Sequence, residues 1–379
     1  MYPELDERRE RGLYREMYEA HDAAPATAVD GEDALVVCSN NYLGLATHDR
    51  LADAAAEAAR EYGTGAGASR LVSGNLEPHR ELEDALASLK RTETALVFSS
   101  GYAANVGTLG ALLDERDAVF SDSLNHASII DGCRLSGADV HVYEHADADD
   151  LREKYGSVDA RRKLVVTDTV FSMDGDVAPL EELASVTRND PDGYLMVDEA
   201  HATGVVGDEG TGAVGELGLT DVVDIQIGTL SKALGSQGGF VAADNDTRSL
   251  LVNEARSFVY STGLSPVDAA VSREAVSVVR GDEGDALRDD LRENVALVRE
   301  RVEDAGYEVY GDTHILPVVV GGAEETVEVA DQLRDNGVFA PAIRPPTVPE
   351  GTSRIRISMT AAHSRDDAER VARAFEEAV

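Results

Sequence analysis

Seven short apolar runs determine the fold class of the chain: ALVFSS (95–100), AVFSDS (118–123), DVHVYEH (139–145), KLVVTDTVFS (163–172), YLMVDEAH (194–201), VVDIQIGT (222–229) and GGFVAA (238–243). Amphipathic segments such as AANVGTLGALLDE (103–115) and LEELASVTRND (180–190) separate them. Strands that alternate with helices form βαβ units. We therefore expect an α/β fold in which helices flank a mostly parallel central sheet.

The segments on either side of these runs predict the rest of the domain organisation. Before them, we expect an N-terminal helical segment over residues 1–42 and a large α/β domain over 43–279, with helices at 49–62 and 77–90. After them, a long helical pattern precedes the apolar runs HILPVVVGG (314–322) and RIRISMT (354–360). This change of pattern predicts a smaller α+β C-terminal domain over 280–379.

Composition excludes several classes of protein. The 379 residues include 34 basic and 72 acidic side chains, so the formal net charge is −38. The electric field of this negative charge repels phosphate, so we expect no nucleic-acid partner. We expect no membrane partner either, because no apolar run reaches about 18 residues. The charged N-terminus and only two cysteines, Cys38 and Cys133, favour a reducing cytoplasmic location.

The acidic excess also suggests adaptation to salt. Only four of the 34 basic residues are lysines. Few lysines together with dispersed Asp and Glu are typical of a protein adapted to concentrated salt, because salt screens the repulsion between the protein's own negative charges. We predict that desalting causes a sharp loss of structure by circular dichroism, and full stability in dilute buffer would contradict this hypothesis.

Lys232 is the strongest single candidate for chemistry. It follows an apolar run and lies in LSKALGSQGG (230–239), among small residues. A lone lysine is usually a surface residue. Small neighbours, however, leave room for a bulky group beside the amine, and such an amine can form a Schiff base.

Asp198 and His201 form a second candidate group. Asp198 ends an apolar run, and His201 follows three residues later. Asp198 could simply cap a turn, and the pair could suggest a metal site, although two ligands without a third make a poor one. A carboxylate facing a pyridinium nitrogen is the functional interpretation.

Other polar residues also follow predicted strands. His126 and Ser172 lie at two such ends, and Gly101 and Tyr102 begin a helix whose N–H groups could bind phosphate. Ligands of open α/β sheets bind outside the carboxyl ends of the strands. Together with Lys232 and Asp198, this order of groups points to pyridoxal 5′-phosphate.

The sequence resembles the fold-type I pyridoxal phosphate enzymes, and within them the α-oxoamine synthases, from about residue 34 to 365. The motifs that carry the resemblance are SNNYLGLA (39–46), SGYAAN (100–105), FSMDGD (171–176), VDEAHATG (197–204), GTLSKALGSQGG (228–239) and AIRPPTVPEGTSRIRISMTAAH (342–363). The last of these is the most discriminating, because the glycine-using members usually differ there.

The resemblance implies roles for individual residues. Lys232 would hold the cofactor covalently, Asp198 would pair with its ring nitrogen, and His126 would stack on the ring and take part in catalysis. Further implied cofactor contacts are Gly101, Tyr102, Ser172, His201, Thr229 and, reaching the neighbouring subunit's phosphate, Thr262. The implied substrate contacts are Arg15, His126, Arg344 and Thr347, with Arg8, Arg9 and Arg11 as competitors of Arg15.

The implied activity is decarboxylative condensation of L-alanine with pimeloyl-CoA, or a pimeloyl carrier-protein thioester, in biotin biosynthesis. The family also implies a homodimer with a shared active site. Two alternatives stay open. One is a sister activity such as glycine C-acetyltransferase or 5-aminolevulinate synthase, since one methyl group in a pocket is worth only about 1–3 kcal/mol. The other is a catalytically silent paralogue that acts as a binding or scaffold protein.

Overall fold

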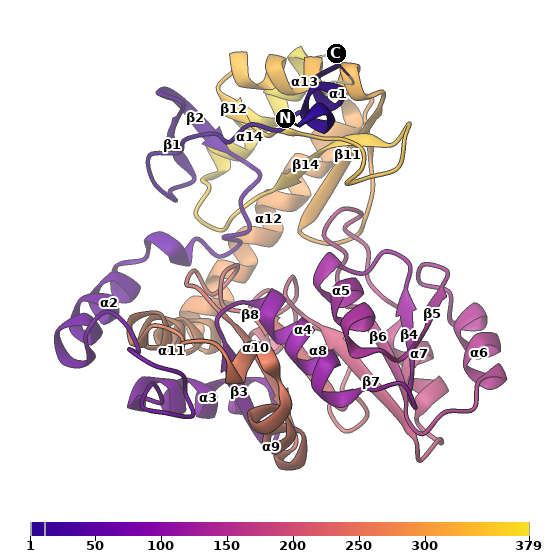
Figure 1. Cartoon of the computed structure of the whole chain (residues 1–379). Coiled ribbons are helices and arrows are strands. Elements are labelled where there is room, and N and C mark those ends of the chain that lie inside the picture. The colour runs from indigo at the N-terminus through magenta and orange to yellow at the C-terminus, as the bar shows by residue number, and fades with distance from the viewer. Residues whose placement is uncertain (1, 11–12, 379) are drawn as a thin grey trace. The chain divides into compact units, whose positions relative to one another are not determined.

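The computed structural model describes residues 2–10 and 13–378 and divides the chain into two compact units (Figure 1). The large unit comprises Leu45–Phe171 and Val177–Ala286. The small unit comprises Met1–Gly44, Ser172–Asp176 and Leu287–Val379. The small unit is therefore built from both ends of the chain and one short central segment.

The large unit contains one seven-stranded sheet in the order β3-β9-β8-β7-β6-β4-β5. Its strands are β3 (Thr94–Phe98), β4 (Ala118–Asp122), β5 (Asp139–Tyr143), β6 (Lys163–Asp168), β7 (Gly193–Asp198), β8 (Ile225–Thr229) and β9 (Gly239–Ala243). Strands β5, β4, β6, β7 and β8 are parallel, whereas β9 runs antiparallel to β8 and β3. The predicted mostly parallel sheet is confirmed.

Helices bury both faces of this sheet, which is why its strands are almost continuously apolar. The helices are α2 (Asp49–Tyr62), α3 (Glu77–Lys90), α4 (Gly101–Leu112), α5 (Ala127–Ser136), α6 (Ala148–Ser157), α7 (Leu180–Thr187), α8 (Ala213–Glu216), α9 (Asn245–Glu254), α10 (Arg256–Val259) and α11 (Pro266–Arg280), with short 3-10 turns at Leu45–Thr47 and Asp208–Gly210. On one face, Leu109 of α4, Ile129 of α5 and Phe258 of α10 pack in one cluster with alternate strand residues. The helices predicted at 49–62 and 77–90 are confirmed as α2 and α3.

A fully buried ion pair lies beneath the turn that follows β7. Lys90, the last residue of α3, contacts the carboxylate of Glu199, and both side chains are 0% exposed. Lys90 Nζ also donates to the carbonyl of Thr211 at 2.6 Å, and Glu199 accepts from the N–H of Val214 at 2.9 Å. A Cβ at Gly212 would lie 2.5 Å from a Glu199 oxygen and 2.7 Å from Lys90 Nζ. Only glycine fits there, so the pair fixes the backbone around it.

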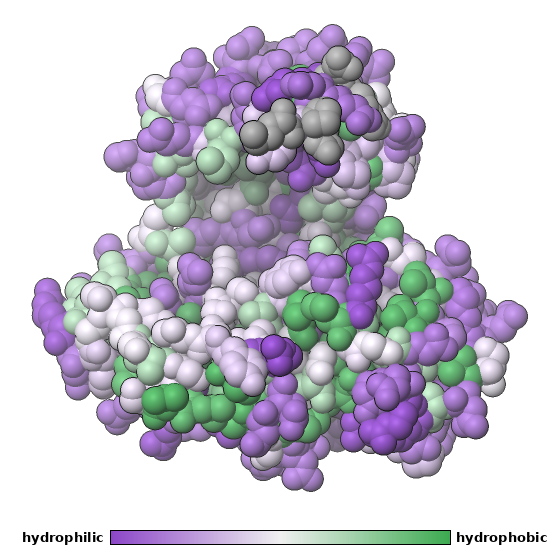
Figure 2. Space-filling model, viewed as in Figure 1, coloured by the Kyte–Doolittle hydropathy of each residue, from purple (hydrophilic) through white to green (hydrophobic). Residues whose placement is uncertain are grey.

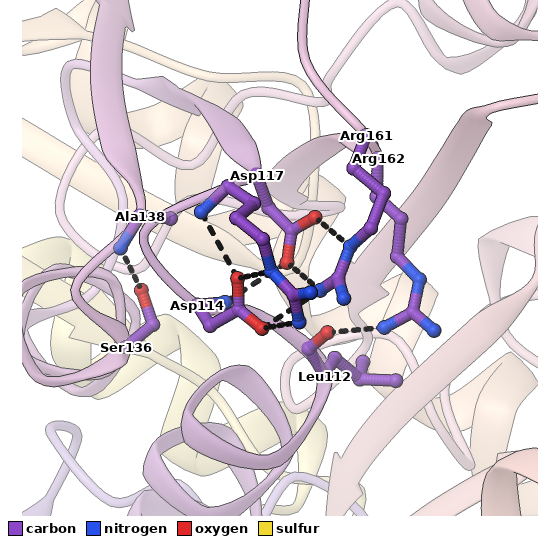
Figure 3. A network of polar contacts seen from close by, with 8 residues as sticks. Leu112, Asp114, Asp117, Ser136, Ala138, Arg161 and Arg162 are labelled. Atoms are coloured by element: carbon purple, nitrogen blue, oxygen red, sulfur yellow. Dashed lines mark hydrogen bonds and ion pairs between the residues drawn. The ribbon is translucent and has the colours of Figure 1, made fainter.

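Another ionic network closes the loops before β4 and β6 (Figure 3). Arg161 donates to both Asp114 and Asp117, and Arg162 donates to the carbonyl of Leu112 at 2.7 Å. Hydrogen bonds from Arg116 hold the pKa of Asp114 well below its usual range. Charges at this amino end of the strands are thus paired with one another.

The small unit has its own antiparallel sheet, in the order β10-β11-β14-β13. Its strands are β10 (Glu308–Val309), β11 (Ile315–Gly321), β13 (Ala342–Ile343) and β14 (Ser353–Ser358). The C-terminal helices are α12 (Asp282–Asp304), which begins in the large unit, α13 (Ala323–Asp335) and α14 (Arg365–Glu377). This matches the α+β pattern expected for the C-terminal part.

The N-terminal part differs from the helical segment expected over 1–42. Only α1 (Pro3–Glu10) is helical, and β1 (Ala26–Val29) pairs antiparallel with β2 (Glu32–Val36). Asp30 and Gly31, both with positive φ, form the two-residue turn that hairpins favour. Strand β12 (Val338–Phe339) then pairs in parallel with β2 and completes a three-stranded sheet.

Hydrophilic residues cover much of the visible face of each unit (Figure 2), in keeping with the large net charge. Among residues 2–10 and 13–378, no helix is both long and apolar enough to cross a lipid bilayer.

We predict that Lys90→Met destabilises the protein by about 3–5 kcal/mol, because it leaves the buried Glu199 carboxylate unpaired. The matched control is Lys154→Met, since Lys154 pairs with Asp150 on the partly exposed surface of α6 and such pairs contribute about 0–1 kcal/mol. Urea unfolding measures both. Equal losses for the two variants would contradict the role given to the buried pair.

Candidate active site

The carboxyl ends of three neighbouring strands bring the main candidates of the large unit together. Asp168 of β6 is in register with Asp198 of β7, and Asp198 is in register with Ile227 of β8. Thr229 ends β8. Because these strands are parallel, their ends form one edge, where ligands of open α/β sheets bind.

Asp198 is a buried carboxylate that is satisfied by hydrogen bonds on both oxygens. It is 5% exposed. One oxygen accepts from Asn105 Nδ2 at 2.6 Å, and the other accepts from the N–H of Ala200 at 2.8 Å. These donors keep the carboxylate in a fixed orientation at the edge of the sheet.

Lys232 lies in a tight loop that glycine makes possible. The loop closes where the N–H of Leu230 donates to the carbonyl of Gly238. Gly235 has φ +62°, and a Cβ there would lie 2.5 Å from the backbone nitrogen of Ala46. The loop places Lys232 Nζ 2.8 Å from Nε2 of His201. Lys232 and His201, which were predicted as separate candidates, are therefore in direct contact.

His126 caps the start of α5 with its own side chain. Nδ1 accepts from the N–H of Ser128 at 3.2 Å and lies 2.7 Å from the Ser128 hydroxyl. Much of the residue is exposed, but partial burial lowers the pKa of His126; nearby Asp198 raises that pKa and Lys232 lowers it. A neutral ring whose Nδ1 accepts must carry its proton on Nε2.

The start of α4 can receive an anion. Ser100 caps this helix by accepting from the N–H of Ala103, and Gly101 and Tyr102 form its first turn. First-turn N–H groups have no acceptor within a helix, so they suit a phosphate. Thr229 lies beside Gly101, since a Cβ on Gly101 would be 3.5 Å from Thr229 Cβ. The Tyr102 hydroxyl donates to Asp131 at 2.5 Å.

Asp168 is a second buried carboxylate at this edge, and it was not among the residues predicted from the sequence. It accepts from the N–H of His126 at 2.7 Å. Burial raises the pKa of Asp168 well above its usual value, and the charge of Asp198 raises it further. An acidic residue at the end of a strand next to the Asp198 strand was the signal that could have identified it.

Two other predicted cofactor contacts, Thr262 and Ser172, belong to different units of the chain. Thr262 is exposed in the large unit and forms an isolated bridge with Ser69. Ser172 belongs to the small unit, where its carbonyl accepts from Arg356 at 2.5 Å.

Arg356 was not singled out from the sequence. It is buried, and besides Ser172 it donates to Asn40 and to the Tyr42 hydroxyl. These acceptors are all neutral, so its charge is available for an anion. The alternation of arginine and isoleucine in RIRIS (354–358) was the available signal, because arginine at alternate positions of a buried strand is costly without a purpose.

The predicted substrate contacts of the small unit share one cavity. Arg15, Arg344 and Thr347 all line a space of about 410 Å³. Arg15 donates to the Thr347 hydroxyl at 2.8 Å. Of the competing arginines, Arg9 pairs with Asp6 and Arg8 is exposed. Arg11 lies outside the described residues.

The comparison with protein families identifies the chain's relatives. Residues 32–375 match the model of aminotransferase class I and II. The chain belongs to this aminotransferase class I and II family. A curated relative in it, the 8-amino-7-oxononanoate synthase of Pelobacter propionicus, is 49% identical over 370 residues, which is 96% of this chain and 94% of that protein.

Solved structures give the same fold. The serine palmitoyltransferase of Sphingomonas wittichii matches with a TM-score of 0.94 and 31% identity over 100% of this chain and 96% of that one. A serine palmitoyltransferase of S. paucimobilis, solved with a bound PLP–myriocin aldimine, matches with a TM-score of 0.93 and 28% identity over 99% and 96%. The expected fold type of pyridoxal phosphate enzymes is confirmed.

The groups at the sheet edge of this aminotransferase-family chain fit a phosphorylated pyridine aldehyde. The Asp198 carboxylate suits a protonated ring nitrogen, and Lys232 supplies a primary amine. The start of α4 suits the phosphate, and the exposed His126 ring suits a stacked aromatic ring.

We predict that the free energy of unfolding of Asp168→Asn rises relative to that of the unsubstituted protein as the pH rises from about 5 to about 8. The folded-state pKa of Asp168 lies above its unfolded value. Its contribution to stability is therefore complete below the unfolded pKa and is lost as the pH rises through the folded pKa. Asparagine cannot ionise, and its carbonyl can still accept from His126.

Urea unfolding of the chain at both pH values measures this effect. Asp114→Asn is the matched control, because the folded-state pKa of Asp114 is lowered and its contribution is constant above the unfolded pKa. If the difference in unfolding free energy between Asp168→Asn and the unsubstituted protein does not change with pH, the pKa of Asp168 is not raised in the folded protein.

Proposed function

We propose that this chain condenses L-alanine with a pimeloyl thioester, carried by CoA or a carrier protein, to give 8-amino-7-oxononanoate, the free thiol carrier and CO2 in biotin biosynthesis. The observation that carries the proposal is the 49% identity to a synthase of that product over 96% of this chain and 94% of the relative. Identity to the serine palmitoyltransferase with the same fold is lower, at 31%.

Pyridoxal 5′-phosphate would supply a carbonyl that binds the amino acid and a ring that withdraws electrons from its Cα. Asp198 would hold a proton on the ring nitrogen, because a buried carboxylate beside that nitrogen stabilises the charged form. The first turn of α4 and Thr229 would bind the phosphate, and His126 would cover one face of the ring.

Lys232 is the proposed general base for the Cα proton of alanine. His201 Nε2, 2.8 Å from the Lys232 amine, would hold that amine in place. A positioned base contributes about 10²–10⁴-fold to such a step. The new bond joins alanine Cα to the thioester carbonyl carbon, the C–S bond breaks, and the alanine carboxylate leaves as CO2.

His126 would stabilise the negative oxygen that develops on the thioester carbonyl. Its accepting Nδ1 leaves the Nε2 proton free to donate. Losing one such donor typically costs about 3–4 kcal/mol of transition-state stabilisation.

The small unit would bind the substrate's anionic groups. Arg344 and Thr347 are the proposed carboxylate contacts, and Arg15, in the same cavity, is the proposed contact of the acyl substrate. Arg356 is a second candidate for a carboxylate, because it is buried and its acceptors are uncharged. A planar guanidinium binds a carboxylate through two parallel hydrogen bonds and fixes its orientation.

A homodimer is part of the same proposal. The large unit exposes apolar side chains at Leu71, Val72 and Tyr260, near the Ser69–Thr262 bridge. Apolar areas on the visible face of this unit are seen in Figure 2. Burying such residues favours association, and the exposed Thr262 is the proposed contact of the neighbouring subunit's phosphate.

Two free cysteines favour a cytoplasmic location.

The test is a substrate panel analysed by mass spectrometry. Alanine, glycine and serine are each incubated with pimeloyl-, acetyl-, succinyl- and palmitoyl-CoA and the protein loaded with pyridoxal phosphate. We expect alanine with pimeloyl-CoA to be the preferred pair by about tenfold or more. Lys232→Ala should lose about 10²-fold or more in rate, whereas Lys154→Ala, on the partly exposed surface of α6, should not.

Preference for glycine or serine would assign the chain to a sister activity. A colourless protein that does not bind added pyridoxal phosphate would favour a binding or scaffold role. Either result would contradict the proposed function.

A further inference from the structure

One buried amide joins two groups of the candidate active site that come from different elements. Asn105 lies on α4 and is 1% exposed. Its Nδ2 is 2.6 Å from a carboxylate oxygen of Asp198 and 2.9 Å from the hydroxyl of Ser128 on α5. A single nitrogen therefore contacts both the strand end that carries Asp198 and the helix that begins after His126.

The direction of these hydrogen bonds follows from the groups involved. An ionised carboxylate only accepts hydrogen bonds, so the amide must turn its nitrogen toward Asp198. The same nitrogen carries a second N–H, which donates to the Ser128 oxygen. Asn105 Oδ1 is buried and has no hydrogen-bond partner in the described part of the chain. A buried oxygen without a partner lowers the stability of the fold. Stability alone therefore does not explain an asparagine at this position.

Ser128 extends this chain of hydrogen bonds to His126. Its oxygen accepts from Asn105 and lies 2.7 Å from His126 Nδ1. The hydroxyl proton is thus free to donate to Nδ1, which also accepts from the N–H of Ser128. Both contacts favour the tautomer that is protonated on Nε2.

We propose that Asn105 is a positioning residue that orients the Asp198 carboxylate with one amide proton and favours the Nε2–H tautomer of His126, through Ser128, with the other. This inference rests on the proposed function only in that Asp198 and His126 face the cofactor and the substrate. It assigns a role to the final residue of SGYAAN (100–105) that sequence patterns alone do not supply.

Substitutions can separate the two hydrogen bonds that Asn105 donates, one to Asp198 and one to Ser128. Asn105→Ala removes both donors, whereas Ser128→Ala removes only the hydroxyl between Asn105 and His126. Asn105→Asp keeps the shape of the side chain but removes its N–H donors. This variant replaces Asn105→Ala in the same measurements if the alanine variant fails to fold. Asn253→Ala is the matched control, because Asn253 is an exposed amide on α9 whose Nδ2 donates to the Ser249 carbonyl.

Two readouts that need no turnover test the proposal on the full-length protein. The first is the dissociation constant of pyridoxal phosphate, measured by its visible absorbance. The second is the tautomer of His126, measured by ¹⁵N NMR of its ring. We expect Asn105→Ala to weaken cofactor binding by about tenfold or more, since hydrogen bonds to charged groups are among the stronger ones, and to raise the Nδ1–H fraction of His126.

We expect Ser128→Ala to raise the Nδ1–H fraction while weakening cofactor binding less than Asn105→Ala does. The proposal is overturned if the folded Asn105 variants match Asn253→Ala in both readouts, or if they lower only the thermal midpoint. A failed substrate panel with these readouts changed as expected would instead reject the proposed function and leave the positioning role intact.

Discussion

A buried carboxylate must be hydrogen-bonded, and this requirement governs the edge of the large sheet. Asp198 accepts from Asn105 and from the N–H of Ala200, while neighbouring Asp168 accepts from the N–H of His126. Two carboxylates side by side favour one charge rather than two. The elements that surround this edge, from the start of α4 to the loop of Lys232, are arranged so that these acids have donors.

The rest of the large unit supports that arrangement. The Lys90–Glu199 pair and Gly212 fix the turn between Asp198 and His201 from beneath. At the other end of the strands, Arg116 and Arg161 neutralise Asp114 and Asp117. Paired charges thus serve structure at the amino end, whereas at the carboxyl end the polar groups remain available for a ligand.

Much of this organisation follows from local sequence, and the remainder does not. All seven strands of the large sheet follow from short apolar runs, and helices α2 and α3 were also expected. Lys232, Asp198 and His201 follow from their places after strands. The β1–β2 hairpin was not predicted, because its strands are only four and five residues long and its Asp30–Gly31 turn lies in a charged segment. Asp168, Asn105 and Arg356 were missed because their importance depends on partners 42, 93 and 184 residues away in the sequence.

The proposed function requires that the Lys232 amine hold the cofactor. The other lysines are already engaged: Lys90 with Glu199, Lys154 with Asp150 and Lys163 with Asp190. Borohydride reduction of the protein loaded with pyridoxal phosphate, followed by peptide mapping, tests this most directly. We expect a single stable label on the peptide that contains Lys232. A label on any other lysine, or no label, would contradict it.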